Sequence, residues 1–161
     1  MKRWLWSESH GFRLFAIITI AAVVNLFALI LSTTALSWNK VEIPPIPNGP
    51  ENLAVLPWPM ILVMLYLWVY GEEIIFRVPL GLIAPHVQLP ITLTAAVTSS
   101  VLFGYLHGGI SHIAIQGISG FIYSIIFLKC GGMKGKRLKP LLASTSAHFL
   151  GNVLIMGRHF I

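Results

Sequence analysis

The sequence has few charged residues and a single cysteine. Only 10% of its 161 residues are charged, against about 25% in a typical soluble domain. Hydrophobic residues make up 56% and the mean hydropathy is +0.81. This composition excludes a water-soluble globular domain and predicts an integral membrane protein. With Cys130 as the only cysteine, neither an intramolecular disulfide nor a thiolate metal cluster can form.

Basic residues outnumber acidic ones, giving a net charge of +6. They do not indicate nucleic-acid binding, because they lie in short segments between apolar runs and form no patch interleaved with aromatic residues. The basic segment from Lys129 to Lys139 is predicted to be cytoplasmic by the positive-inside rule, and so is the basic and aromatic start of the chain, residues 1–6. The localisation predicted from this pattern is a prokaryotic inner membrane, with the N-terminus in the cytoplasm.

Long apolar runs predict an all-α fold, a polytopic bundle of about five transmembrane helices in one membrane domain of residues 1–161. The runs cover residues 14–36, 58–82, 91–106, 113–128 and 140–156. The first run is longer than the apolar region of a signal peptide, about 7–15 residues, and no convincing cleavage site follows it, so we expect a retained helix. Residues 38–59 form a proline-rich loop, and Pro79 is expected to bend or end the second helix.

Gly117 and Gly120 lie in the fourth run. Small residues at this spacing allow helices to approach closely in lipid. The sequence leaves open whether this face packs within the chain or against a second copy.

Two carboxylates and a guanidinium interrupt the second apolar run, at Glu72, Glu73 and Arg77. Each costs roughly 2.5–3.5 kcal/mol to insert, so these residues are functional candidates. Glu73 and Arg77 are four residues apart and can pair on one helix face, whereas Glu72 points to a neighbouring face. The alternative is a buried ion pair that only fixes helix packing.

Three further polar side chains lie within or at the ends of the runs. His107 closes the third run, and His148 and Asn152 share one face of the fifth. A single membrane histidine is usually a packing residue, but these residues together with the carboxylates permit activation of water. Glu72 near His107 can hold and deprotonate a water, and His148 and Asn152 can stabilise an oxyanion.

The motifs Glu72-Glu73-x-x-x-Arg77, Phe103-x-x-x-His107 and His148-x-x-x-Asn152 appear in this order on separate apolar runs. In this the chain resembles the CAAX protease and bacteriocin-processing family over about residues 57–156. The resemblance implies a glutamate-dependent intramembrane endopeptidase that needs no metal or other cofactor. It implies Glu72 as base with His107 as its partner, His148 and Asn152 at the oxyanion, and Glu73 and Arg77 in support.

The helix lengths predict a difficulty. Glu72 lies ~10 Å before Pro79 along its helix, whereas His107 ends a helix that begins ~25 Å earlier. The two side chains can meet only if the second helix continues past Pro79 or the third is tilted.

Two other enzyme classes compete. Gly117-x-Ser119-Gly120 followed by Ala147-His148 resembles the serine and histidine signature of rhomboid proteases, with Ser119 as nucleophile, but rhomboids place an extra span between the two residues. Glu72, His107 and His148 are also candidate zinc ligands, although no His-Glu-x-x-His pair is present.

A non-catalytic membrane scaffold or bacteriocin-immunity protein remains the alternative outside enzymes. For the protease, the expected partners are the lipid bilayer and a membrane-associated protein or peptide, such as a prenylated tail, a leader peptide or a C-terminal sorting tail.

Overall fold

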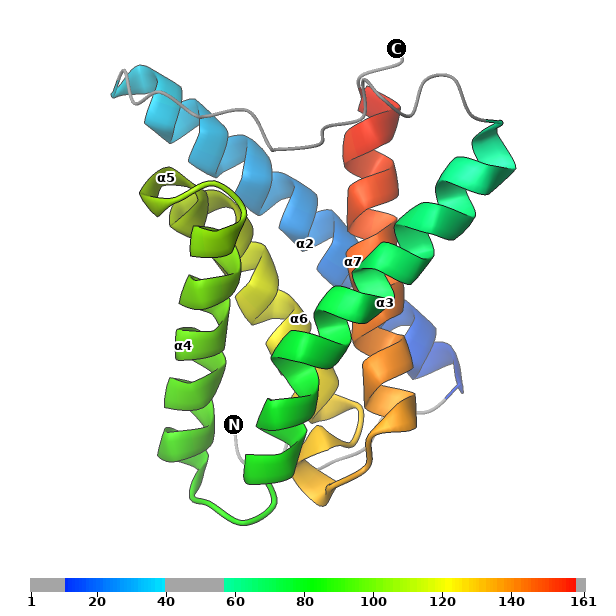
Figure 1. Cartoon of the computed structure of the whole chain (residues 1–161), viewed down its shortest axis with the longest axis vertical. Helices are drawn as coiled ribbons and strands as arrows, with labels where there is room; N and C mark the ends of the chain where they lie inside the picture. The colour runs from blue at the N-terminus through cyan, green and yellow to red at the C-terminus, as the bar shows by residue number, and fades with distance from the viewer. Residues whose placement is uncertain (1–10, 40–56, 159–161) are drawn as a thin grey trace.

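A computed structural model of the chain describes residues 11–39 and 57–158, and within these ranges it contains helices and no strand (Figure 1). The elements are α2 (Gly11–Trp38), α3 (Trp58–Ile83), α4 (Leu89–Leu106), α5 (Ile110–His112), the π-helical turn η2 (Ile113–Gly117), α6 (Ile118–Lys129), the 3-10 turn η3 (Gly132–Lys134) and α7 (Leu138–Arg158). The predicted all-α bundle is confirmed. The chain's basic start and most of its proline-rich loop lie outside the described residues.

Four helical segments are long and apolar enough to cross a membrane: α2, α3, α4 and the continuous stretch from α5 through α6. On the outer faces of these helices large apolar side chains such as Phe27, Leu31 and Leu106 are exposed, as lipid-facing residues are. The chain is therefore an integral membrane protein.

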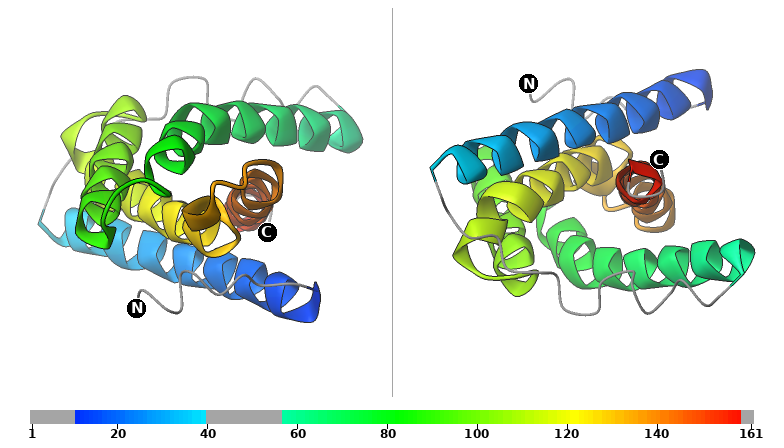
Figure 2. Two further views of the ribbon diagram at one scale, coloured as in Figure 1. Left: turned by 90° about the horizontal axis from the view of Figure 1, so that it is seen from below. Right: turned by 90° about the horizontal axis from the view of Figure 1, so that it is seen from above.

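The fifth helix, α7, spans 21 residues but carries more polar side chains than the other four. It lies between α2 and α3 and also contacts α6 (Figure 2). Its neighbours shield its buried polar residues, among them Ser144, Thr145 and His148, from lipid. The polarity of α7 thus reflects its central position in the bundle.

One end of the bundle gathers the start of α2, the α3–α4 turn and the basic turn before α7. Leu14 of α2 and Leu138 of α7 line the same cavity of about 310 Å³. A Cβ atom added at Gly135 would lie 3.5 Å from Cγ of Pro85 in the α3–α4 turn. The start of α2 and the basic turn therefore lie at the same end of the bundle.

Glycines allow α4 to approach both η2 and α6 closely. A Cβ atom at Gly117 would lie 3.1 Å from the carbonyl oxygen of Ser100, and one at Gly120 would lie 3.0 Å from the ring of Phe103. In this structure the glycine face of the fourth apolar run packs within the chain.

Substitution Gly104→Ala is expected to destabilise the protein by about 1–3 kcal/mol, because the new methyl group overpacks a tight helix contact. Its Cβ would lie 2.7 Å from both the His112 carbonyl oxygen and the Ile113 Cα, and backbone atoms cannot move aside locally. Gly71→Ala is the matched control, since no atom lies within 4 Å of its Cβ position. Thermal unfolding in detergent should show a lower Tm for Gly104→Ala and an equal or higher one for Gly71→Ala. Equal Tm values for the two variants would contradict this packing.

The structure brings Glu72 and His107 together despite the difference in depth that the helix lengths predict. Pro79 lies inside α3 and does not end it, since the helix continues to Ile83. The α3 helix runs obliquely to α4 rather than alongside it (Figure 1). Glu72, near the middle of α3, lies 3.5 Å from Nε2 of His107 at the end of α4.

Candidate active site

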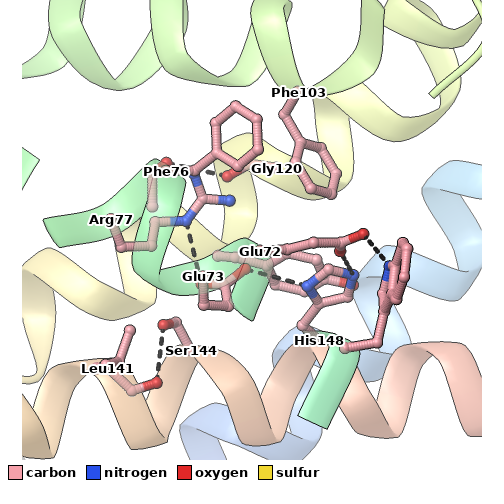
Figure 3. Close-up of polar contacts among 12 residues, drawn as sticks. Glu72, Glu73, Phe76, Arg77, Phe103, Gly120, Leu141, Ser144 and His148 are labelled. Carbon is pink, nitrogen blue, oxygen red and sulfur yellow. Dashed lines mark hydrogen bonds and ion pairs between the residues drawn. The ribbon is translucent and has the colours of Figure 1, made fainter. Parts of the chain in front are cut away.

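The α3 helix supplies the three charged side chains of the cluster (Figure 3). Arg77 Nε lies 3.2 Å from Glu73 Oε2, and both side chains are fully buried. This is the pairing that their four-residue spacing predicts. Arg77 also donates to Ser99 Oγ on α4 at 3.4 Å, and its guanidinium carbon lies 5.8 Å from the ring centroid of Phe103. Arg77 is thus held by Glu73 on its own helix and by Ser99 and Phe103 on α4.

His148 of α7 lies between the two carboxylates. Its Nδ1 is 3.1 Å from Glu73 Oε1, and its Nε2 is 3.8 Å from Glu72 Oε2. A carboxylate can only accept, so Nδ1 carries a proton and Nε2 faces Glu72. The imidazole stacks on Tyr123 at 4.5 Å between centroids and meets the edge of Phe103 at 5.6 Å. These contacts fix the position of the ring and direct its Nδ1 toward Glu73.

His107 approaches Glu72 from α4. Its Nδ1 donates to the carbonyl oxygen of Phe103 at 2.7 Å, which leaves Nε2 facing Glu72 Oε1 at 3.5 Å. Trp68, one turn earlier on α3, donates its indole N–H to the same carboxylate oxygen. The Glu72 side chain is 18% exposed, whereas Glu73 is fully buried. Glu72 is therefore the accessible carboxylate, with an imidazole nitrogen near each oxygen.

Asn152 is half-buried and lies one turn beyond His148 on α7. Across the described ranges, no hydrogen bond or ion pair joins it to Glu72, Glu73, Arg77, His107 or His148. The structure therefore brings five of the six predicted site residues into one connected cluster and leaves Asn152 at its margin.

Ser119 and His148, the candidate pair of a serine protease, each contact other groups. Ser119 is buried and its hydroxyl donates at 3.3 Å to the carbonyl oxygen of Ile115 in the preceding turn η2, while both ring nitrogens of His148 face carboxylates. Within residues 11–39 and 57–158, no group of three or more His, Cys, Asp or Glu side chains is placed to hold a metal ion.

Sequence reasoning missed three side chains that touch the cluster, Trp68, Ser99 and Tyr123, and a fourth, Asn25, that binds Tyr123. Spacing could have found Trp68, four residues before Glu72 on the same helix face. Insertion cost could have found Asn25, an amide within the first apolar run. Ser99 and Tyr123 carried no comparable signal, because serine and tyrosine are common in membrane helices.

The family model of the Rce1-like type II CAAX prenyl endopeptidases matches residues 54–154. The chain belongs to this family. The matched region of this Rce1-like protein contains all six predicted site residues and leaves α2 outside. No curated protein and no solved structure matches the chain. At the level of the family, the protein is a CAAX-type intramembrane endopeptidase.

Proposed function

We propose that this Rce1-like protein hydrolyses a peptide bond of a membrane-associated substrate with a water activated by Glu72. The observation that carries the proposal is the contrast between the two carboxylates. Glu73 is buried and bound to Arg77 and His148, whereas Glu72 is partly exposed and faces an imidazole nitrogen on each side. Only Glu72 is free to hold a water and take its proton.

In this mechanism the water binds between Glu72 and Nε2 of His107. Glu72 takes a proton while the water oxygen forms a bond to the carbonyl carbon of the peptide, and the π electrons move to the carbonyl oxygen. His148 Nε2–H and the Asn152 amide donate to this oxyanion. When the tetrahedral intermediate collapses, the C–N bond breaks and Glu72 returns its proton to the leaving amine.

The position of His148 supports its role as a donor. The ring lies between the two carboxylates, with Nδ1 3.1 Å from Glu73 Oε1 and Nε2 3.8 Å from Glu72 Oε2. The donor role requires a proton on Nε2, the ring nitrogen that lies beside Glu72.

An apolar groove between α3 and α4 favours a substrate with a hydrophobic or prenylated tail. The groove has a volume of about 710 Å³ and begins beside the cluster at Phe76 and Ser99. Its volume lies within the range of about 300–1,000 Å³ that is usual for ligand sites. The remaining lining residues are Ile75, Pro79, Leu80, Ile83, Pro90, Ile91, Thr94, Ala95, Thr98 and Leu102.

The proposal is tested by incubating the purified protein in lipid vesicles with a prenylated C-terminal peptide and with the same peptide lacking the prenyl group. Mass spectrometry of the products should show cleavage, faster for the prenylated peptide. In a Thr98→Trp variant the indole fills the groove. Loss of the preference for the prenylated peptide in this variant would show that the groove binds the prenyl group.

The serine and metal mechanisms are tested in the same assay. Ser119→Ala and addition of a chelator are each expected to leave kcat/KM within about two-fold of the untreated wild type. The reason is that neither the Ser119 hydroxyl nor a metal ion takes part in the proposed proton transfers. Activity that is lost with Ser119→Ala would support the serine protease, and activity lost with the chelator would support a metalloprotease.

A further inference from the structure

The α2 helix lies outside the region matched by the family model, yet one of its side chains reaches the site. Asn25 is buried, with 1% of its surface exposed, and its Nδ2 donates to the hydroxyl of Tyr123 on α6 at 2.7 Å. The residues before and after it in α2 are predominantly apolar. The amide is thus a buried polar group whose bonded partner belongs to another helix.

Tyr123 carries this contact to the site. Its ring stacks on the His148 imidazole at 4.5 Å between centroids and 19° between planes. The opposite end of the ring, the hydroxyl, is held by Asn25. A rigid ring tethered at its far end limits how the imidazole stacked on it can tilt, so the position of α2 is transmitted to His148.

Gly151 provides the space for this arrangement. A Cβ atom at this position of α7 would lie 2.9 Å from the Tyr123 hydroxyl and 3.0 Å from Asn25 Nδ2. Three helices therefore converge on one hydrogen bond, three residues along the chain from His148.

Helix packing alone does not account for an asparagine here. The Oδ1 atom of Asn25 has no hydrogen-bond partner among the described residues, so the buried amide uses only part of its bonding capacity. An apolar side chain would pack α2 against α6 without this cost. What the amide adds is a directional contact with the Tyr123 hydroxyl.

We propose that Asn25 and Tyr123 are positioning residues that hold the His148 imidazole in its reactive orientation, so that α2 is a functional part of the site. The inference rests on the proposed function for its effect on catalysis. Its structural content, the orientation of the His148 ring and the proton on its Nδ1, can be measured without any substrate.

The test compares Asn25→Leu, Tyr123→Phe, the double variant and Tyr123→Leu, with Thr34→Val as the control in α2. Thr34 is exposed and its hydroxyl donates within its own helix. The first readout is the set of ring nitrogen and carbon resonances of His148 in labelled protein, identified by their loss in His148→Gln. The second is kcat and KM, measured across pH beside Glu72→Gln.

The wild-type resonances should report a proton on Nδ1, and Tyr123→Leu should shift them most. A 1 Å displacement of a catalytic group can cost about 10²-fold, so kcat should fall about 10²-fold in Tyr123→Leu with KM little changed. Asn25→Leu and Tyr123→Phe should each lower kcat about 10-fold. The double variant should lower it no further, because each single variant already removes the same hydrogen bond between Asn25 and Tyr123. In all of them the pH profile of kcat should move, whereas Thr34→Val should match the wild type.

A purely structural role would lower Tm but leave the His148 resonances, the pH profile and kcat per folded molecule unchanged, and this result would overturn the inference. If Glu72→Gln remained active while the His148 resonances shifted as expected, the proposed function would fail and the positioning role would stand. If Glu72→Gln were inactive and the Asn25 and Tyr123 variants matched the wild type in both readouts, the proposed function would stand and the positioning role would fail.

Discussion

Glu72→Gln is expected to lower kcat/KM by about 10²–10⁴-fold, the usual contribution of a general base. Glutamine has nearly the same shape and its carbonyl oxygen still accepts from the Trp68 indole, so the variant should remain folded. It cannot take a proton from the water. Because water activation belongs to the transition state, the loss should appear in kcat rather than in KM.

Two companion variants separate this effect from a general loss of structure. Glu72→Asp keeps a carboxylate but withdraws it from His107 and His148, so its activity should lie between those of the wild type and Glu72→Gln. Ser119→Ala removes a buried hydroxyl that donates to the Ile115 carbonyl oxygen one turn earlier, and it should behave as the wild type. Peptide cleavage that survives Glu72→Gln would refute Glu72 as the base.

Arg77→Met is expected to destabilise the protein by about 3–5 kcal/mol, the usual effect of removing one partner of a buried ion pair. Glu73 and Arg77 are both fully buried, so no solvent can replace the lost guanidinium. The remaining Glu73 carboxylate would also lose its orientation toward His148. A large fall in Tm, accompanied by loss of cleavage, should be seen in the purified variant.

The matched control is Arg13→Met, which removes an exposed cation near the start of α2 and should change Tm little. A double variant, Arg77→Met with Glu73→Gln, removes the uncompensated charge and should be more stable than Arg77→Met alone. An Arg77→Met protein as stable as the wild type would contradict the buried pair.

The helices could be predicted from the sequence because lipid imposes a simple rule. Every backbone polar group in the membrane must be paired within its own segment, so long apolar runs become helices. The predicted runs correspond to α2, α3, α4, the α5–α6 stretch and α7. The rule does not describe the interior of the bundle. There α7 contacts other helices rather than lipid, and it is more polar than the other helices.

The charged cluster could also be predicted in part, because charged groups in hydrocarbon are costly and must find partners. The pairing of Glu73 with Arg77 follows from four-residue spacing on one helix. The contacts of Glu72 and Glu73 with His148 depend on how α3 and α7 cross, and residue spacing carries no information about crossing. The sequence left open whether α3 continues past Pro79, because a proline inside an apolar run can either bend or end the helix.

Tertiary packing likewise conceals the stacking of Tyr123 on His148 and its bond to Asn25. Tyrosine is common in membrane helices, and only the arrangement of α2, α6 and α7 places Tyr123 against His148 and Asn25. The π-helical turn Ile113–Gly117 could not be predicted from the sequence either, although it ends at Gly117, one of the two glycines that lie against α4.

The measurement that tests the central claim most directly is a single turnover in oxygen-18 water with enzyme in excess, quenched at short times and analysed by mass spectrometry. If a water activated by Glu72 attacks the peptide, the new carboxyl group of the product carries the label and the enzyme mass never changes. A transient adduct on the enzyme, or label incorporated into Glu72, would contradict direct attack by water and show that a side chain is the nucleophile.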